Sequence, residues 1–363
     1  MSSAAQTLSD QGPPSGMTGP VAWARANLFN SWTNSILTVI ALYIIVRVGW
    51  SLIGWGIVNA EWTGNAAACH KAAGACWAVI HEKFRLMLFG TYPYAQQWRP
   101  ALAIVLFLAM IPPSCVRQIW NRWLLVAWAI VLFVMGWLMF GGLGLPTVQT
   151  SNFGGLPLTL MLSIVGILFA FPLAMVLALG RRSRLPVVRS FCIGYIEFFR
   201  GVPLISLLFL ASAMFPLFMP VGVTIDGLLR AQIAVILFAA AYMAEVIRAG
   251  LQALPKGQYE AAEALGLSYP KRTVLIVLPQ ALKIVIPPLV NNFIGTFKNT
   301  SLVVIIGLFD LLGTIKLATQ DPVWRSFSFE GYIFAAVLFF VFCFFMSKFS
   351  QYLEKLLSRS KTR

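Results

Sequence analysis

Two short stretches of this 363-residue chain carry polar side chains at spacings that could do chemistry. Residues 256–270 read KGQYEAAEALGLSYP and hold two carboxylates, Glu260 and Glu263, among small alanines. Residues 298–301 read KNTS and place a cation beside an amide and two hydroxyls inside an otherwise apolar run. The first stretch suits a charged contact with a protein surface, and the second could meet a polar solute.

No recognisable catalytic or nucleotide-binding pattern accompanies these stretches. The sequence has no G-x-x-x-x-G-K-[ST] phosphate loop, no H-E-x-x-H pair and no G-x-S-x-G nucleophile. Ionisable residues inside the apolar runs, which often mark proton or ion relays, are limited to Arg47, Glu245 and Lys298. For Glu245 and Arg248, three positions apart, we expect a local ion pair on one helix face.

The composition is that of a multi-span membrane protein. Hydrophobic residues make up 59% of the chain and charged residues 11%, with a mean hydropathy of +0.81; soluble domains carry about 25% charged residues. The net charge of +15 comes from Lys and Arg in short segments between apolar runs. This pattern sets membrane orientation and differs from a solvated basic face. Membrane lipid is therefore expected as a partner, and nucleic acid is not.

Apolar runs of near-spanning length predict an all-α membrane protein with about eight transmembrane helices. They lie at about 34–58, 101–116, 123–141, 155–179, 202–220, 228–248, 284–308 and 331–349. If the N-terminus is cytoplasmic, the inner segments hold more than twice as many Lys and Arg residues as the outer segments. Both termini are therefore expected in the cytoplasm.

These runs divide the chain into four predicted parts. Residues 1–33 form a disordered or interfacial tail, 34–150 an N-terminal transmembrane extension, 151–350 the core and 351–363 a basic cytoplasmic tail.

The extension contains an outer loop at about 59–98 that carries Cys69, His70, Cys76 and His81. A zinc site is conceivable, but these residues lack compact ligand spacing. A disulfide between Cys69 and Cys76 suits an oxidising compartment, and two unpaired thiols are the remaining alternative. We expect no metal and no other cofactor.

The residues of the first polar stretch predict a short helix with sharp ends. Pro255 and Gly257 should end the preceding helix, residues 258–265 can form about two turns, and Gly266 supplies a left-handed end. Ser268 can then cap the next helix. A helix this short is marginal in water and must dock on something. Two interpretations remain open: a plug that enters a groove of a partner protein, and a connector packed on its own bundle.

The same residues carry a family resemblance. Glu260-Ala261-Ala262, three residues, Gly266, nine residues and Ile276-Val277-Leu278-Pro279 match the EAA-x3-G-x9-I-x-L-P loop of ABC importer permeases. Around this loop, AYMAEVIRAGLQALPKGQYEAA, LPQALKIVIPPLVNNFIGTFKNTSL and YIEFFRGVPL resemble the permeases for polar amino acids, over about residues 155–350. The N-terminal part, with GACWAVI and RRSRLPVVR, resembles the larger permeases of general L-amino-acid importers.

The resemblance implies a type I importer fold for the C-terminal five helices, in a bacterial inner membrane. It implies transport of broad-range polar L-amino acids into the cytoplasm, with no catalysis in this chain. The implied partners are an ABC ATPase subunit acting as a dimer, a second permease subunit and a periplasmic amino-acid-binding protein. The ATPase would receive the loop residues Glu260, Ala261, Ala262 and Gly266.

Candidate residues of the substrate pathway lie in the second polar stretch and two turns before it. They are Asn292, Lys298, Asn299, Thr300 and Ser301. Asn299 departs from the Asp that these permeases often have, which removes a possible acidic contact. The alternative function is a self-contained ion-coupled carrier or channel. A membrane-embedded enzyme is a more distant possibility, because no paired acid/base or metal constellation is present.

Overall fold

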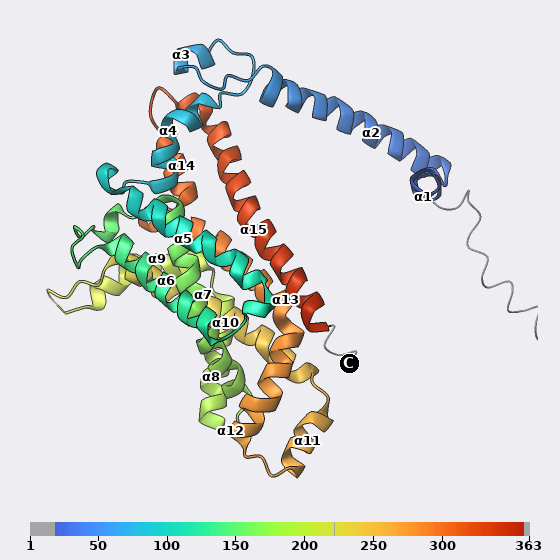
Figure 1. Ribbon diagram of the computed structural model, residues 1–363, viewed down its shortest axis with the longest axis vertical. Helices are drawn as coiled ribbons and strands as arrows, with labels where there is room; N and C mark the ends of the chain where they lie inside the picture. The colour runs from blue at the N-terminus through green and yellow to red at the C-terminus, as the bar shows by residue number, and fades with distance from the viewer. Residues whose placement is uncertain (1–18, 221, 359–363) are drawn as a thin grey trace, which may run out of the picture. The chain divides into compact units, whose positions relative to one another are not determined.

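The computed structural model describes residues 19–220 and 222–358 (Figure 1). Within these ranges the chain is helical, and its only extended pairings are isolated bridges. Seven described helices are long and apolar enough to cross a membrane, or eight if one bent pair counts as a span. The prediction of an all-α membrane protein with about eight spans is confirmed.

The α-helices are α1 (Pro20–Asn27), α2 (Trp32–Ile53), α3 (Ala66–Cys69), α4 (Ala78–Phe89), α5 (Trp98–Cys115), α6 (Arg122–Phe140), α7 (Gly155–Arg181), α8 (Pro186–Gly201), α9 (Leu204–Phe209), α10 (Gly227–Ala253), α11 (Lys256–Ala264), α12 (Tyr269–Arg272), α13 (Leu278–Asn299), α14 (Leu311–Ala318) and α15 (Ser328–Ser358). Short π- and 3-10 segments extend several of them. The longest continuous stretch, Tyr269–Ile306, joins α12, a π-helical turn, α13 and a 3-10 segment.

Residues up to Ala78 form one unit, within which α2 buries no side chain. The loop after α2 is closed by a disulfide between Cys69 and Cys76, so of the three alternatives for these cysteines the structure contains the disulfide. The indole of Trp77 donates to the Gly56 carbonyl at 2.7 Å and ties the loop to the end of the span. Of the tail predicted to be disordered, residues 1–18 lie outside the described residues.

Residues from Val79 onward form the second unit, whose centre is a bundle of α7, α10 and α13. Ala170 and Ala174 of α7, with Ala240 and Ala244 of α10, are fully buried in its core. Small side chains let helix backbones approach closely in a membrane. Gly250 marks another close contact, because a Cβ there would lie 2.9 Å from the Ala281 carbonyl oxygen. In Figure 1, α11 and α12 lie at one end of this unit and α4 and α14 at the other.

A hairpin of α5 and α6 packs beside α7, and a buried arginine joins the two helices at the end opposite the turn. Arg99 is only 1% exposed; its Nε donates to the Leu138 carbonyl at 2.7 Å and its Nη1 to Pro146 at 2.9 Å and Gln96 at 2.7 Å. A planar guanidinium can satisfy several carbonyls in this fixed arrangement. Arg99 was not singled out from the sequence.

The apolar run at 202–220, predicted as a span, does not form one regular helix. Helix α8 and the segment Leu204–Phe218 meet at an angle of 101°. Val202 is extended, with φ −102° and ψ 132°, as is usual for a residue that precedes proline. Pro203 cannot continue the helical hydrogen-bond pattern, so the chain turns here. Beyond α9 it continues as a π-turn and a short 3-10 helix rather than as a regular span.

At the end of the second unit that holds α14, a buried carboxylate caps a helix. Asp310 is 0% exposed, and its Oδ1 accepts a hydrogen bond from the Gly313 amide at 2.9 Å. Burial raises the pKa of Asp310 to about 6, although the amides of Gly313 and Leu312 oppose that shift. Nearby, Lys83 of α4 lies 2.9 Å from Asp321, and this hydrogen bond lowers the pKa of the Asp321 carboxyl.

Candidate coupling site

Helix α11 is a short polar helix with defined ends. Leu254 is extended before Pro255, which separates α11 from α10. At the other end Gly266 has φ +69°, and its amide donates to the Glu263 carbonyl at 2.9 Å. The Leu267 amide donates to Ala262 at 3.2 Å. These two hydrogen bonds and the left-handed residue form a Schellman motif.

The boundaries differ slightly from those predicted for this helix. It begins at Lys256, so Gly257 lies within it rather than before it. Ser268 occupies the N-cap position of α12, but its side chain makes no capping hydrogen bond. The left-handed conformation predicted for Gly266 is confirmed.

One face of α11 is anchored to its own bundle. Ala262 is 2% exposed. The Tyr259 hydroxyl donates to the Leu251 carbonyl at 2.7 Å and accepts from Arg182 Nη1 at 3.0 Å. Gln280 donates to Gln258 at 2.9 Å. These contacts connect α11 to the ends of α7, α10 and α13.

The opposite face of α11 is exposed and consists mainly of small residues. Gly257, Glu260, Ala261, Ala264 and Leu265 lie within about 140° of one another around the helix, at 100° per residue. All five are exposed, and Leu265 is 77% exposed. We call these five residues the outer face. A surface of small side chains with one carboxylate and one leucine can fit closely into a groove, and Leu265 was missed in the sequence.

A network of charges lies behind the anchored face. Glu245 of α10 accepts from Arg248 Nε at 2.9 Å and from Arg181 Nη1 at 3.3 Å. Arg181 also contacts Glu197 of α8 at 2.9 Å. The predicted Glu245–Arg248 pair is therefore present, but Arg181, which joins three helices, was not singled out from the sequence. Arg181 and Arg182 are adjacent, so the α7 terminus contacts both this network and α11.

The candidate pathway residues do not converge on one point. Asn292 and Asn299 are seven positions apart in α13 and share a face, whereas Lys298 projects from a different side and is exposed. Thr300 is buried and donates to the Phe297 carbonyl at 2.8 Å; Ser301 donates to Lys298 at 2.9 Å. The two hydroxyls are thus occupied by local backbone groups.

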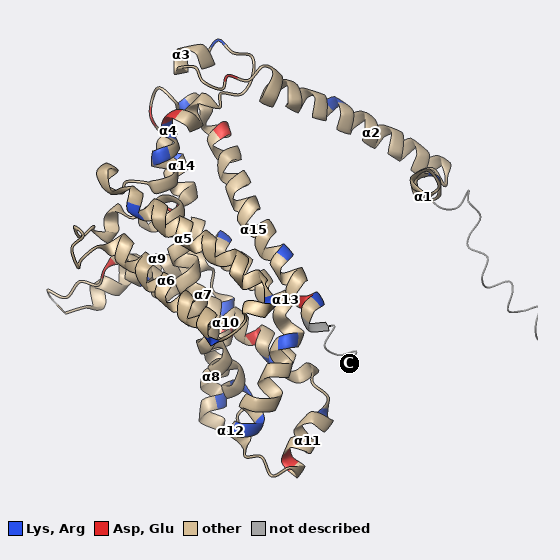
Figure 2. Cartoon of the chain, in the orientation of Figure 1, with Lys and Arg blue, Asp and Glu red and all other residues tan. Residues whose placement is uncertain are grey.

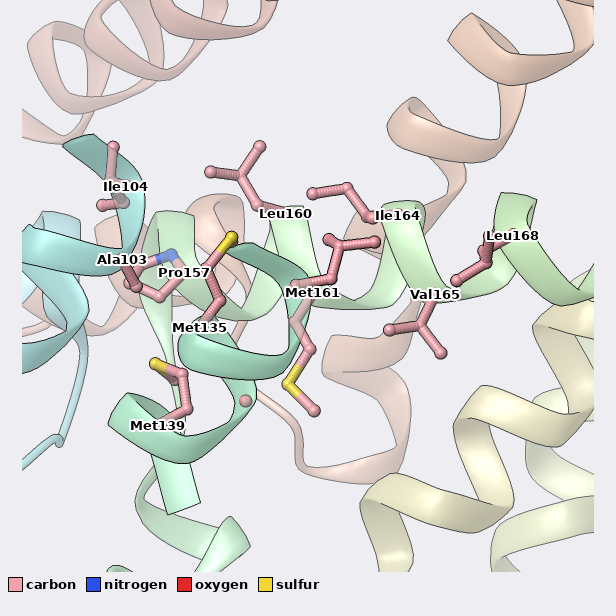
Figure 3. Close-up of a pocket in the computed structure, with 12 residues that line it drawn as sticks. Ala103, Ile104, Met135, Met139, Pro157, Leu160, Met161, Ile164, Val165 and Leu168 are labelled. Carbon is pink, nitrogen blue, oxygen red and sulfur yellow. The ribbon is translucent and has the colours of Figure 1, made fainter. Parts of the chain in front are cut away.

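A cavity of about 100 Å³ lies between α5, α6 and α7. Figure 3 shows apolar side chains around it, including Ile104, Met135, Met161 and Ile164. Such a lining offers no charge or hydrogen bond to a polar solute. The cavity is therefore suited to apolar contacts within the membrane and not to recognition of a zwitterion.

Comparison with known proteins places the chain in a family. The family model for inner membrane components of binding-protein-dependent transport systems matches residues 170–359. An inner membrane amino-acid ABC transporter permease protein of Escherichia coli, YhdY, is 50% identical over 345 residues, which cover 94% of each chain. A glutamate/glutamine/aspartate/asparagine transport system permease protein of Rhodobacter capsulatus, BztC, is 39% identical and covers 98% of this chain and 97% of its own.

The chain belongs to this family of inner membrane permeases. A crystal structure of an amino acid ABC transporter with histidines has 31% sequence identity and a TM-score of 0.50, and the match covers 55% of this chain and 91% of that chain. The match to the permease family runs from within α7 to the end of α15 and includes α11. Membership favours a transporter subunit over the self-contained carrier considered from the sequence.

Proposed function

We propose that this permease moves amino acids into the cytoplasm and couples that movement, through the outer face of α11, to a separate ATPase dimer. The observation that carries the proposal is the two-sided packing of α11. One face is held by Tyr259 and Ala262, while Glu260, Ala261 and Leu265 remain exposed. A helix anchored in this way can transmit a push from a partner to α7 and α10.

The amino-acid cargo is supported by the names of the two relatives, each of which covers nearly the whole chain. A periplasmic amino-acid-binding protein would deliver the cargo, and a second permease subunit would complete the pathway. The missing phosphate loop supports an ATPase on another polypeptide. Broad-range polar L-amino acids remain the proposed substrate class.

The proposed orientation places both ends of the sequence in the cytoplasm of a bacterial cell. The excess of Lys and Arg in the inner segments supports it. Figure 2 shows Lys and Arg residues near α8, α11 and α12, at the end of the bundle that we assign to the cytoplasm. We also propose that residues 151–350 form the transport core and residues 34–150 an extension with a periplasmic loop.

Along the core we propose that Lys298, with Asn299 and Asn292, faces the amino-acid pathway. Lys298 is exposed in this single chain, and an ammonium within a span requires a partner or an aqueous route. It could meet a substrate carboxylate by a charge-assisted hydrogen bond. The hydroxyls of Thr300 and Ser301 are engaged locally, so they would shape the wall of the pathway.

Reconstitution tests the function directly. The chain would be placed in liposomes alone, and with its ATPase, second permease and binding protein. We expect uptake of labelled amino acids only with all subunits and ATP, and loss of uptake when ATP hydrolysis by the ATPase is blocked. Uptake by the chain alone, driven by an ion gradient, would overturn the proposal and restore the carrier.

A further inference from the structure

Four arginines line a cavity of about 380 Å³ at the ends of α7, α8 and α10. Arg181 and Arg182 come from the end of α7, Arg189 from the start of α8 and Arg248 from α10, with Ile193 and Gln252 completing the wall. Arg181 and Arg248 also belong to the charge network around Glu245. None of the residues that line the cavity belongs to the outer face of α11.

The cavity holds more positive charge than its own carboxylates neutralise. Glu245 pairs with Arg181 and Arg248, and Glu197 pairs with Arg181. Arg182 bonds only neutral groups, the Leu251 carbonyl at 3.1 Å and the Tyr259 hydroxyl at 3.0 Å. The guanidinium of Arg189 has no hydrogen-bond or ion-pair partner in the described part of the chain. Two of the four cations thus lack a counter-charge.

We propose that this cavity binds the phosphate headgroup of an anionic phospholipid from the cytoplasmic leaflet. Guanidinium groups bind phosphate oxygens with charge-assisted hydrogen bonds. Basic pockets between the cytoplasmic ends of membrane helices are suited to such headgroups. Arg189, together with the N–H groups of Arg182 that do not bond Leu251 and Tyr259, would bind the phosphate.

The apolar surroundings favour a lipid over a soluble phosphate. Val187 and Phe191, four positions apart on α8, are 79% and 70% exposed and form an apolar face on the side of the helix opposite Arg189, which is two positions from each. Ile193, four positions after Arg189 and on the same side of α8, lines the cavity and would contact an acyl chain while the headgroup binds the arginines. The lipid would then link α7, α8 and α10 at the place where Arg182 also holds Tyr259 of α11. The inference rests on the proposed orientation, but not on the proposed cargo.

The test measures lipid binding to the full chain in detergent by native mass spectrometry, with dioleoylphosphatidylglycerol or dioleoylphosphatidylcholine added. We expect Arg189→Gln to weaken binding of phosphatidylglycerol about fivefold, which corresponds to about 1 kcal/mol for one basic residue at the membrane surface. Arg184→Gln is the matched control. Arg184 is an exposed arginine of the same segment that does not line the proposed site; it lines a neighbouring cavity with Glu263 and Arg272, and Arg182 borders both cavities.

Each other outcome contradicts the inference in a different way. Equal losses for Arg189→Gln and Arg184→Gln would show general attraction to a basic surface and no site. Displacement of phosphatidylglycerol by millimolar inorganic phosphate would show a site for soluble anions. Unchanged lipid binding with reduced co-purification of the ATPase would assign Arg189 to a protein contact.

Failure of the inference is distinguishable from failure of the proposed function, because uptake by the complete transporter is measured separately. Labelling of Arg189→Cys by a membrane-impermeant thiol reagent, in inside-out and right-side-out vesicles and relative to the native chain with its own free cysteines, checks the side of the membrane. Labelling only from the periplasmic side would overturn the assignment to the cytoplasmic leaflet.

Discussion

Among the residues of α11 and its C-terminal turn, Gly266 is the one with a left-handed backbone conformation. A Cβ at Gly266 would have no atom within 4 Å, so a side chain meets no steric obstacle there. The cost arises from the backbone, because φ is +69° at this position. A residue with a side chain loses about 1–2 kcal/mol in this left-handed conformation, which Asn tolerates better than Val.

We therefore expect Gly266→Val to weaken association with the ATPase roughly tenfold and to abolish uptake, while membrane insertion is unchanged. Gly266→Asn, the matched control, should retain most of both activities because Asn tolerates the left-handed region. Co-purification and an ATPase assay with loaded binding protein measure the two effects. Normal stimulation in the Val variant would mean that α11 is only a connector.

The proposed role of Lys298 also depends on a single residue, because it requires the positive charge of one side chain. Lys298→Met keeps most of the side-chain length and removes the ammonium. If the ammonium binds the substrate carboxylate, the KM for uptake should rise about tenfold or more. Lys316→Met, which removes an exposed charge from α14, should leave KM unchanged. Unaltered KM and selectivity in Lys298→Met would assign this residue a structural role alone.

At the scale of elements, the proposed coupling requires that α11 is attached rigidly to α7 and α10, so that a movement of the ATPase reaches these helices. The anchor is the Tyr259 hydroxyl, which contacts both Leu251 of α10 and Arg182 of α7. Each such hydrogen bond contributes about 0.5–1.5 kcal/mol. Tyr259→Phe removes the hydroxyl but keeps the ring that packs on the core.

The outer face is unchanged by Tyr259→Phe, so we expect the ATPase to bind normally. Its stimulation by loaded binding protein should fall severalfold, because α11 is less firmly connected to α7 and α10. Tyr269→Phe is the control: Tyr269 is 56% exposed in α12, and its hydroxyl has no hydrogen bond among the described residues. If both variants retain full stimulation, coupling does not pass through Tyr259.

The elements also show which features the sequence could predict. Hydrophobic runs located most spans, and Gly266 located the end of α11, because both signals are local. The angle between α8 and α9 was missed although the sequence contains Val202-Pro203, because the apolar run at 202–220 was interpreted as a span and the proline within it was not interpreted as a break. Arg181 and Arg182 looked like ordinary orientation charges, since their partners Glu197, Glu245 and Tyr259 are distant in sequence. Such partnerships depend on tertiary packing.

At the scale of the whole molecule, the two ends of the second unit differ in how they respond to pH. The end that carries α11 is held by ion pairs between arginines and the carboxylates of Glu197 and Glu245, and the arginines stay charged at all relevant pH values. The opposite end contains Asp310, which is buried, and Asp321, which pairs with Lys83. The pKa shifts of these two carboxyls have opposite directions. Stability near this end should therefore depend on pH through two opposing contributions.

Asp310 has a folded pKa of about 6, above its ordinary value of 3.8. Between these values the folded state binds more protons than the unfolded state, so the free energy of unfolding falls as pH rises from about 4 to 6. The expected loss is about 3 kcal/mol, and it is complete above pH 6. Asp310→Asn keeps an acceptor for the Gly313 amide but cannot ionise. Relative to the native chain, this variant should therefore gain stability between pH 4 and pH 7.

Asp321→Asn provides a control of opposite sign. The lowered pKa of Asp321 stabilises the fold above pH 3.8 and loses that effect as the pH falls through the lowered value. The variant should accordingly be less stable than the native chain at pH 7, and the two should converge in acid. Unfolding in detergent, followed by circular dichroism from about pH 2 to pH 7, measures both differences, because the Asp321 contribution is lost only below pH 3.8. A pH-independent difference between the native chain and Asp310→Asn would show that Asp310 does not titrate in this range and would contradict the prediction.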